Sequence, residues 1–244
     1  MIERTFTVDK QYDGTWGCHK IPDDQLNLLP NENDENLSLS ESFEKNGYVI
    51  LHNVLNEQTL ELIETQFKII RDIEFLDRGL DKNSEDSYYG DETMKNSFHW
   101  YGAHFSEAKL QMMTEKFSEI CQKKLHPCYS YNRIMRKGSF MYVHTDRASC
   151  EYSATICIKE DDNVRWPICI ENKIGIQKQA YLKAGDMVFY RGCKLHHWRV
   201  PFTGTEHIQM MLHYVDSEGE FKDFKYDKRE ALGMASYWEK LYGK

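Results

Sequence analysis

The sequence lacks several features that would assign it to a particular class of protein. No segment approaches the roughly 20 consecutive apolar residues of a membrane-spanning helix, and the first residues carry no apolar run of a signal peptide. The seven cysteines include no Cys-x-x-Cys pair, and their odd number disfavours a disulfide framework or a thiolate zinc site. We therefore expect a cytoplasmic protein with reduced thiols and no association with a membrane.

Blocks of basic residues are also missing. The formal net charge is -8, and no cluster of lysine and arginine stands out along the chain. Proteins that bind duplex nucleic acid carry a positive surface, because contacts with phosphates supply much of the affinity. We therefore expect no duplex nucleic acid as a partner, although this charge does not exclude a single nucleotide or a modified base.

What is present is typical of a globular protein. Apolar residues make up 41% of the 244 residues and charged residues 29%, which is sufficient for a buried core. The segment 23–42 is polar and rich in Asn and Asp, which is typical of a surface loop or linker. We divide the chain into an N-terminal extension, residues 1–42, that packs on one domain, residues 43–244.

Helical periodicity is strongest in the first half of that domain. Apolar residues recur every three or four positions over residues 57–72 and 107–124, which predicts two amphipathic helices. Ser106 is a plausible N-cap of the second helix. Residues 47–51 read as a strand, residues 77–104 as irregular, and residues 227–242 as a final helix.

From Tyr129 onward the pattern changes to short aromatic and β-branched runs separated by turn signals such as Lys137-Gly138. The predicted strands are 129–136, 139–146, 152–159, 164–171, 178–183, 186–191, 196–200 and 206–215. Short strands at this spacing favour two packed sheets. The predicted fold is α+β: a double-stranded β-helix (jelly roll, cupin-like) with flanking N-terminal helices and a C-terminal helix.

One group of residues on the predicted strands has the composition of a metal site. His144 and Asp146 are two residues apart on a strand, so both side chains point to one face. His197 is a possible third ligand from a neighbouring strand, and a shift of one residue in register would present His196 instead. Two histidines and one carboxylate form the facial triad of non-haem Fe(II) oxygenases, which leaves positions open for a 2-oxo acid and O2.

The sequence around these residues resembles the 2-oxoglutarate/Fe(II) dioxygenase superfamily, in particular prolyl-hydroxylase-like members found in microbes and phages. The resemblance covers roughly residues 43–216. It rests on the segments FEKNGYVILHNVL, YSYNRI, HTDRASCEYS, WPI, YRGC and HWR. It implies a dioxygenase domain with a double-stranded β-helix, the iron ligands His144, Asp146 and His197, and coupling of 2-oxoglutarate decarboxylation to substrate oxidation. Because halogenases of this superfamily lack the carboxylate ligand, Asp146 favours hydroxylation or a related desaturation.

One departure from the family pattern concerns the cosubstrate. Prolyl hydroxylases carry a Lys or Arg about ten residues after the distal histidine to bind the far carboxylate of 2-oxoglutarate, and His207 stands there. Arg199 is our candidate for this role, because it lies two residues after His197 and shares its face. The other candidate cosubstrate residues are Tyr131, Arg133, Gln209 and Lys159.

The substrate is less well indicated. Candidate pocket residues are Arg147 and Glu151 beside the metal strand, and Trp100 and Tyr101 from the irregular segment. Arg147 is suited either to a substrate carboxylate or to an ion pair with Glu151, and Tyr88, Tyr89 and His99 either form a lid with Trp100 and Tyr101 or pack against the helices. We favour a small-molecule or amino-acid-like substrate; the competing hypotheses are a cupin-like metal enzyme that does not use 2-oxoglutarate and a non-catalytic jelly-roll binding protein.

Overall fold

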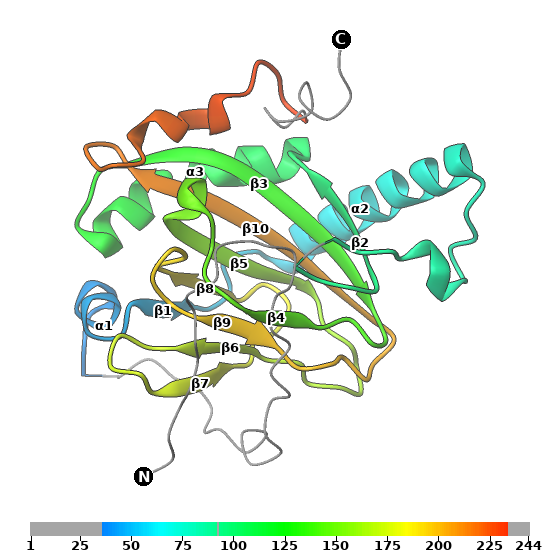
Figure 1. Ribbon diagram of the computed structural model, residues 1–244, viewed down its shortest axis with the longest axis horizontal. Helices are drawn as coiled ribbons and strands as arrows, with labels where there is room; N and C mark the ends of the chain where they lie inside the picture. Colours follow the sequence, from blue (N-terminus) through cyan, green and yellow to red (C-terminus); the bar gives the residue numbers. More distant parts are fainter. Residues whose placement is uncertain (1–35, 92, 234–244) are drawn as a thin grey trace.

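Two antiparallel sheets, packed face to face, dominate the computed structural model, which describes residues 36–91 and 93–233 (Figure 1). The larger sheet contains, in spatial order, β1 (Tyr48–Leu51), β8 (Met187–Tyr190), β5 (Tyr152–Lys159), β10 (Glu206–Asp216), β3 (Leu125–Arg136) and β2 (Ser97–Tyr101). The smaller sheet contains β4 (Met141–His144), β9 (His197–Arg199), β6 (Ile168–Glu171) and β7 (Gln177–Ala180). This arrangement confirms the predicted α+β jelly roll.

The central strand β10 shows why the two faces of the larger sheet differ. Ile208, Met210, Leu212 and Tyr214 belong to the main hydrophobic core. The alternate residues Gln209, Met211 and His213 line a cavity on the opposite face. Because successive side chains of a strand point to opposite faces, one strand supplies both the core and the site.

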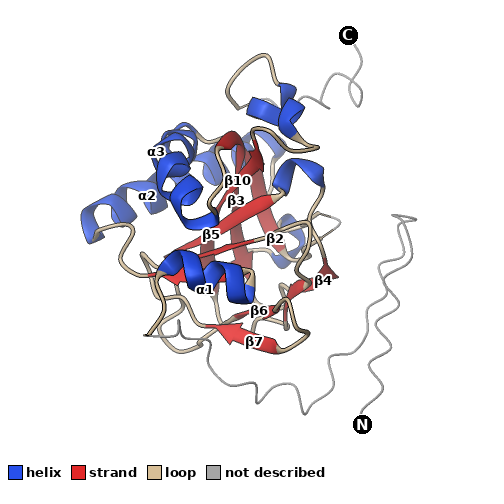
Figure 2. Cartoon of the chain, turned by 90° about the vertical axis from the view of Figure 1, so that its left-hand side faces the viewer, coloured by secondary structure: helices blue, strands red, loops and turns tan. Residues whose placement is uncertain are grey.

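Three helices flank the sheets in the described part of the chain: α1 (Leu39–Asn46), α2 (Glu57–Arg78) and α3 (His104–Cys121). Figure 2 shows α2 and α3 on the side of the larger sheet that faces away from β6 and β7. Aromatic contacts hold them there: Phe117 of α3 stacks on Phe189 of β8 with ring centroids 4.1 Å apart, and Phe67 of α2 meets Trp100 edge-on at 4.6 Å. Such pairs stabilise the core beyond their buried area.

The structure corrects several predicted boundaries. The linker predicted over 23–42 contains the start of α1, which begins after a capping box formed by Ser38 and Glu41. The irregular segment predicted over 77–104 contains β2. Ser106 is not the N-cap of α3; it lies inside the helix, where its Oγ donates to Asn132 Oδ1 at 2.6 Å. These short polar elements have weak local patterns, and tertiary partners stabilise them.

The C-terminal helix predicted over 227–242 lies largely outside the described residues. The part that the structure describes holds a 3-10 segment, η4 (Lys222–Lys228), and Arg229 is extended. Tyr226, Asp227 and Lys228 have positive φ angles, which disfavour an α-helix at this point. Among the described residues, no helix is long and apolar enough to span a membrane.

Candidate active site

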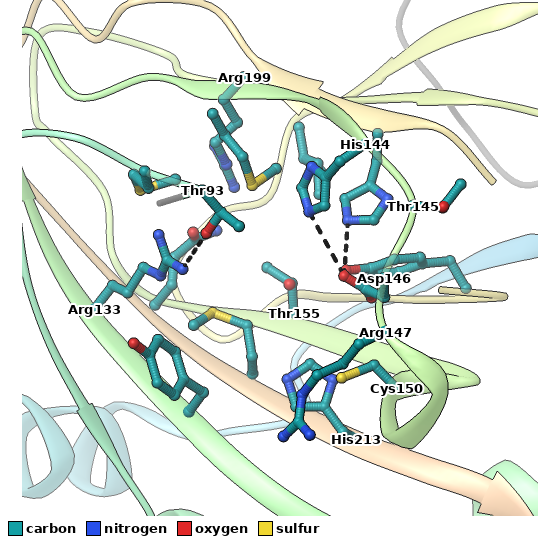
Figure 3. A pocket seen from close by; sticks show the side chains of 18 of the residues that line it. Thr93, Arg133, His144, Thr145, Asp146, Arg147, Cys150, Thr155, Arg199 and His213 are labelled. Carbon is teal, nitrogen blue, oxygen red and sulfur yellow. Dashed lines mark hydrogen bonds and ion pairs between the residues drawn. The ribbon is translucent and has the colours of Figure 1, made fainter. Parts of the chain in front are cut away.

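His144 and His197 are brought together by the pairing of β4 with β9, in which they are directly opposite each other. Asp146 lies two residues beyond the end of β4, not on the predicted strand, and its backbone N–H donates to Gly192 O at 2.9 Å. Its Oδ1 is 3.6 Å from His144 Nε2 and 3.4 Å from His197 Nε2 (Figure 3). Three potential metal ligands therefore converge on one point from two adjacent strands.

The orientation of both imidazoles is set by the backbone. His144 Nδ1 lies 2.8 Å from Tyr142 O, and His197 Nδ1 lies 3.0 Å from Leu195 O. Since a carbonyl oxygen can only accept, Nδ1 carries the proton in each ring and the Nε2 lone pair faces Asp146. This is the arrangement that metal-binding histidines need, with the second nitrogen fixed by an outer partner.

Asp146 is ionised although it is buried. Burial raises the pKa of this carboxyl, but the adjacent His197 and His144 outweigh it and hold the pKa well below its usual range. Ser153 Oγ donates to the other carboxylate oxygen, Asp146 Oδ2, at 2.7 Å. A side chain at Gly192 would collide with Asp146 Oδ2 and Cys150 O, so this glycine is what allows the carboxylate to reach the site.

The two imidazoles respond differently to the same surroundings. Burial and the neighbouring His197 lower the pKa of His144. Burial acts in the same direction on His197, but the Asp146 carboxylate raises its pKa above the ordinary value. A cation placed among these three groups would be coordinated by an anionic carboxylate and two imidazole nitrogens, which fits a divalent transition metal.

These residues open into a cavity of about 330 Å³ between the two sheets, within the usual range of small-molecule sites. The larger sheet contributes polar and aromatic side chains to its wall, and the smaller sheet contributes the histidines and Arg199. The lining includes Thr93, Met94, Tyr101, Tyr129, Tyr131, Arg133, Met141, Asp146, Arg147, Cys150, Thr155, Tyr190, Arg199, Gln209, Met211 and His213.

Arg199 is fully buried and lines this cavity. Its Nη1 donates to Trp166 O at 2.8 Å and its guanidinium lies 4.5 Å from the centre of the Trp166 ring. Burial lowers its pKa to about 10, so it is still protonated at neutral pH. Within residues 36–91 and 93–233 no carboxylate pairs with it. A buried, uncompensated cation of this kind is costly unless an anionic ligand joins it.

His207 stands at the position where the family resemblance led us to expect a basic residue, and the structure places it close to Arg199. Both side chains pack against Trp166, with the His207 ring centroid 5.3 Å from that of the indole. Burial and the nearby Arg199 hold the pKa of His207 well below its usual range, so it is neutral. The positive charge beside Trp166 is therefore carried by Arg199 on β9 of the smaller sheet, and not by His207 on β10 of the larger one.

The second cavity arginine, Arg133, is already compensated. Asp91 Oδ2 lies 2.7 Å from Arg133 Nη2 and accepts a hydrogen bond from the Tyr131 hydroxyl at 3.1 Å. Thr93 Oγ1 also accepts from Arg133 Nη2 at 2.7 Å (Figure 3). Gln209, the remaining candidate that lines the cavity, has a buried Nε2 with no hydrogen-bond acceptor among the described residues. Arg133 Nη1 is likewise buried without a hydrogen-bond acceptor among the described residues. The two arginines differ in charge compensation: Asp91 pairs with Arg133, whereas no described carboxylate pairs with Arg199.

Two of the predicted pocket residues do not line the cavity. Trp100 points to the opposite face of β2, where it packs against Phe67 and Phe98 in the helix-covered core. Glu151 points away from the site and accepts a hydrogen bond from Asp216 N at 2.9 Å. Both predictions were wrong, because neither the face of β2 nor the partner of Glu151 is visible in the local sequence.

Tyr101 and Arg147 do line the cavity, and both bind the carboxylate of Asp227, which is distant in sequence. Asp227 Oδ2 lies 3.0 Å from Arg147 Nη2 and accepts from the Tyr101 hydroxyl at 2.9 Å. Of the two alternatives for Arg147, the ion pair with Glu151 is therefore excluded. Arg147 also lies over the Tyr129 ring, with its guanidinium 4.6 Å from the centroid.

Several histidine, lysine and tyrosine side chains considered for the site lie outside it. His196 points away from the triad, with Nδ1 3.8 Å from Glu171 Oε1. Lys159 pairs with Glu64 and Glu206 outside the cavity. Tyr88 is buried against Phe75, whereas Tyr89 and His99 are not part of the cavity wall.

Sequence reasoning missed three residues that organise the site: Asp91, Ser153 and Asp227. Each is a common polar residue outside the His144-x-Asp146 motif. Asp91 and Asp227 pair with arginines that are distant in sequence, and Ser153 donates a hydrogen bond to Asp146. Only the alternation of β5, which places Ser153 on the same face as Thr155, could have pointed to one of them.

Comparison with known proteins identifies the architecture. A scan against protein-family models and a search of curated protein sequences both found no match. Among solved structures, a Pseudomonas putida prolyl-4-hydroxylase aligns with a TM-score of 0.55 and 14% identity, over 73% of this chain and 97% of that protein. The chain has the fold of the 2-oxoglutarate/Fe(II) oxygenases.

Two further solved structures share this fold. SnoN, a non-haem α-ketoglutarate-dependent epimerase from nogalamycin biosynthesis, aligns with a TM-score of 0.55 and 11% identity over 73% of this chain and 81% of its own. HygX from Streptomyces hygroscopicus, with nickel and 2-oxoglutarate bound, aligns with a TM-score of 0.54 and 10% identity over 72% of this chain and 85% of its own. Enzymes with different reactions therefore use this architecture.

Proposed function

We propose that this protein is a non-haem Fe(II) enzyme that couples the oxidative decarboxylation of 2-oxoglutarate to the hydroxylation of a small-molecule or amino-acid-like substrate. The observation that carries the proposal is the convergence of His144 Nε2, His197 Nε2 and Asp146 Oδ1 at the end of a cavity that also contains an uncompensated arginine. The chain's own residues thus provide separate positions for a divalent metal and for an anionic ligand.

His144, Asp146 and His197 would hold the iron. Their donor set is that of the facial triad, and the carbonyls behind the two rings fix the nitrogen that faces the metal. Bound Fe(II) with 2-oxoglutarate and O2 supplies the oxidising chemistry. Because Asp146 fills the position that would otherwise accept a halide, we favour hydroxylation over halogenation.

Arg199 and Gln209 would bind the far carboxylate of 2-oxoglutarate. A dicarboxylate between the metal and Arg199 would neutralise the buried guanidinium, and Gln209 Nε2 offers a second donor. Tyr131 and Arg133 then serve as a wall that Asp91 holds in place. Tyr101 and Arg147, on the more exposed side of the cavity, are our candidates for contact with the substrate.

The test is to add 2-oxoglutarate to the Fe(II)-loaded protein under anaerobic conditions and to measure the visible metal-to-ligand charge-transfer band. We expect the band in the native protein and its loss in His144→Ala, which should no longer bind iron. Arg199→Met should keep the iron and require at least about tenfold more 2-oxoglutarate for the same band, because an ion pair to a buried carboxylate is lost.

Arg133→Met is the matched control, since it removes another buried arginine of the same cavity. If Arg133→Met weakens the 2-oxoglutarate titration and Arg199→Met does not, the assignment of the clamp is wrong. If iron binds without any band, the 2-oxoglutarate assignment fails and a metal enzyme that uses another cosubstrate replaces it.

A further inference from the structure

Helix α2 is apolar on two opposite faces. Ile63, Phe67 and Phe75 are buried against the sheet, as expected for a surface helix. On the outward face, large aliphatic side chains remain exposed: 53% for Leu62, 53% for Ile69, 64% for Ile73 and 83% for Leu76. The helix therefore buries one apolar stripe in its own core and presents a second one to solvent.

The second stripe is regular and is interrupted by one polar residue, Thr65, between Leu62 and Ile69. Leu62, Ile69 and Leu76 are spaced seven residues apart, close to two helical turns, and Ile73 lies one turn from Ile69. Figure 1 shows α2 at the periphery of the molecule, with its C-terminal half extending past the larger sheet. Single exposed aliphatic residues are ordinary, but four of them on one face of one helix indicate an interaction surface.

The two leucines of the stripe are placed symmetrically about Ile69, whereas Thr65 stands at the position that mirrors Ile73. Leu62 and Leu76 lie seven residues to either side of Ile69, and Thr65 and Ile73 lie four to either side. An antiparallel pair of such helices related by a twofold axis at Ile69 would place each leucine against the other leucine of the second copy. We propose that a second copy of this chain docks on this stripe, so that the two α2 helices pair antiparallel about Ile69.

The charges beside the stripe fit the same arrangement. Lys68 and Asp72 lie along one edge of it, and their side chains are 36% and 45% exposed. Within the chain Lys68 pairs with Glu64 at 2.6 Å and Asp72 with Arg71 at 2.8 Å, so a contact between copies would add to these pairs. In a twofold antiparallel pair, that edge faces the same edge of the other helix. Lys68 of one copy then lies within about two residues, or roughly 3 Å along the axis, of Asp72 of the other. Two symmetric ion pairs between Lys68 and Asp72 then flank the apolar contact. In a parallel twofold pair, the edge that carries Lys68 and Asp72 would face the opposite edge of the other helix, and these two ion pairs would not form.

The first experiment is disulfide trapping in the full-length protein. Under mild oxidation, Ile69→Cys should form a covalent dimer, because the twofold axis brings the two cysteines together. Leu76→Cys should not, because it would face Leu62 of the second copy. The unsubstituted protein controls for its own cysteines. Trapping through Leu76→Cys and not through Ile69→Cys would overturn the antiparallel arrangement.

The second experiment measures the mass in solution by light scattering. We expect twice the 29.0 kDa of one chain. Leu76→Glu should give the monomer, and Ile174→Glu, at a site 76% exposed between β6 and β7, should remain dimeric. Because Leu76 makes little contact with its own chain, circular dichroism of Leu76→Glu should be unchanged. A native protein that is still monomeric at about 50 μM, which means a dissociation constant weaker than that concentration, would overturn the proposal.

Charge reversal tests the register. Lys68→Glu should weaken the dimer by roughly tenfold, since two exposed ion pairs become repulsive contacts. Adding Asp72→Lys to Lys68→Glu should restore the affinity, because the pairs reform with reversed signs. If the double variant is no tighter than Lys68→Glu, these two residues do not face each other and the proposed register is wrong.

Discussion

The hydrogen bond from Ser153 to Asp146 is a small contact with a large expected effect. Ser153 Oγ binds the carboxylate oxygen that does not face the histidines. Removing it in Ser153→Ala should lower Fe(II) affinity by about 10- to 100-fold, because an unrestrained carboxylate rotates away from the ligand position. Anaerobic calorimetric titration with Fe(II) would measure this affinity. Ser149→Ala is the control and should bind iron normally, because Ser149 is also buried but its Oγ lies beside Cys150 Sγ, at 3.9 Å.

The ionisation of Asp91 should make the free energy of unfolding depend on pH in the acid range. Burial raises the pKa of this carboxyl, but Arg133 and the surrounding hydrogen bonds outweigh it and lower the pKa from 3.8 to about 2. A folded-state pKa below the unfolded one stabilises the fold above about pH 4, and the contribution disappears as pH falls toward 2. It amounts to roughly 2 kcal/mol.

Denaturant unfolding of the native protein and of Asp91→Asn at several pH values would measure this effect. The stability difference between them should be constant from about pH 7 to about 4 and should shrink between about pH 4 and 2. A difference that does not change over this interval would show that Asp91 is not ionised against Arg133 in the folded state.

Among the secondary-structure elements, Glu107 connects α3, β3 and the segment after η4. Its Oε1 accepts from Ser130 N and Oγ, both at 2.8 Å, and its Oε2 pairs with Arg229. Glu107→Ala leaves the buried Arg229 without its partner, so the free energy of unfolding should fall by about 3 to 5 kcal/mol. Urea denaturation would measure this change. Glu115→Ala, exposed on the same helix, should change it by less than about 0.5 kcal/mol.

For the protein as a whole, metal binding should stabilise the fold. A ligand present at about 100 times its dissociation constant adds about 2.7 kcal/mol. For a chain of this size that raises the melting temperature by roughly 5 to 10 °C. We expect this shift with Fe(II) or Mn(II), its reversal by a chelator, and its absence in His197→Ala.

His196→Ala is the matched control, because this neighbouring histidine points toward Glu171 and not toward the triad. It should show the same metal-induced shift as the native protein. Loss of the shift in His196→Ala with retention in His197→Ala would mean that the distal ligand is wrongly assigned.

Local sequence patterns were enough to predict the sheet-rich architecture and to single out His144 and Asp146, whereas it was the family resemblance that implied His197 rather than His196. Alternation along strands such as β10 separates the core from the cavity. Asp146 lies two residues beyond His144, the last residue of β4, and is close to both His144 and His197. The spacing of apolar residues likewise indicated α2 and α3, although α2 continues to Arg78, beyond the predicted end at residue 72.

Which charges are free to meet a ligand could not be predicted in this way and follows from the tertiary fold. Arg133 and Arg199 both lie on predicted strands, and the sequence does not show which of them is paired. Asp91 compensates the charge of Arg133, whereas Arg199 has no carboxylate partner in the described part of the chain. Trp100 was a candidate for the pocket and lies in the core. Glu151 was one possible partner of Arg147, which instead binds Asp227, 80 residues away. The physical reason is the same in each case: a side chain's charge, pKa and access to a ligand depend on partners that distant segments bring to it.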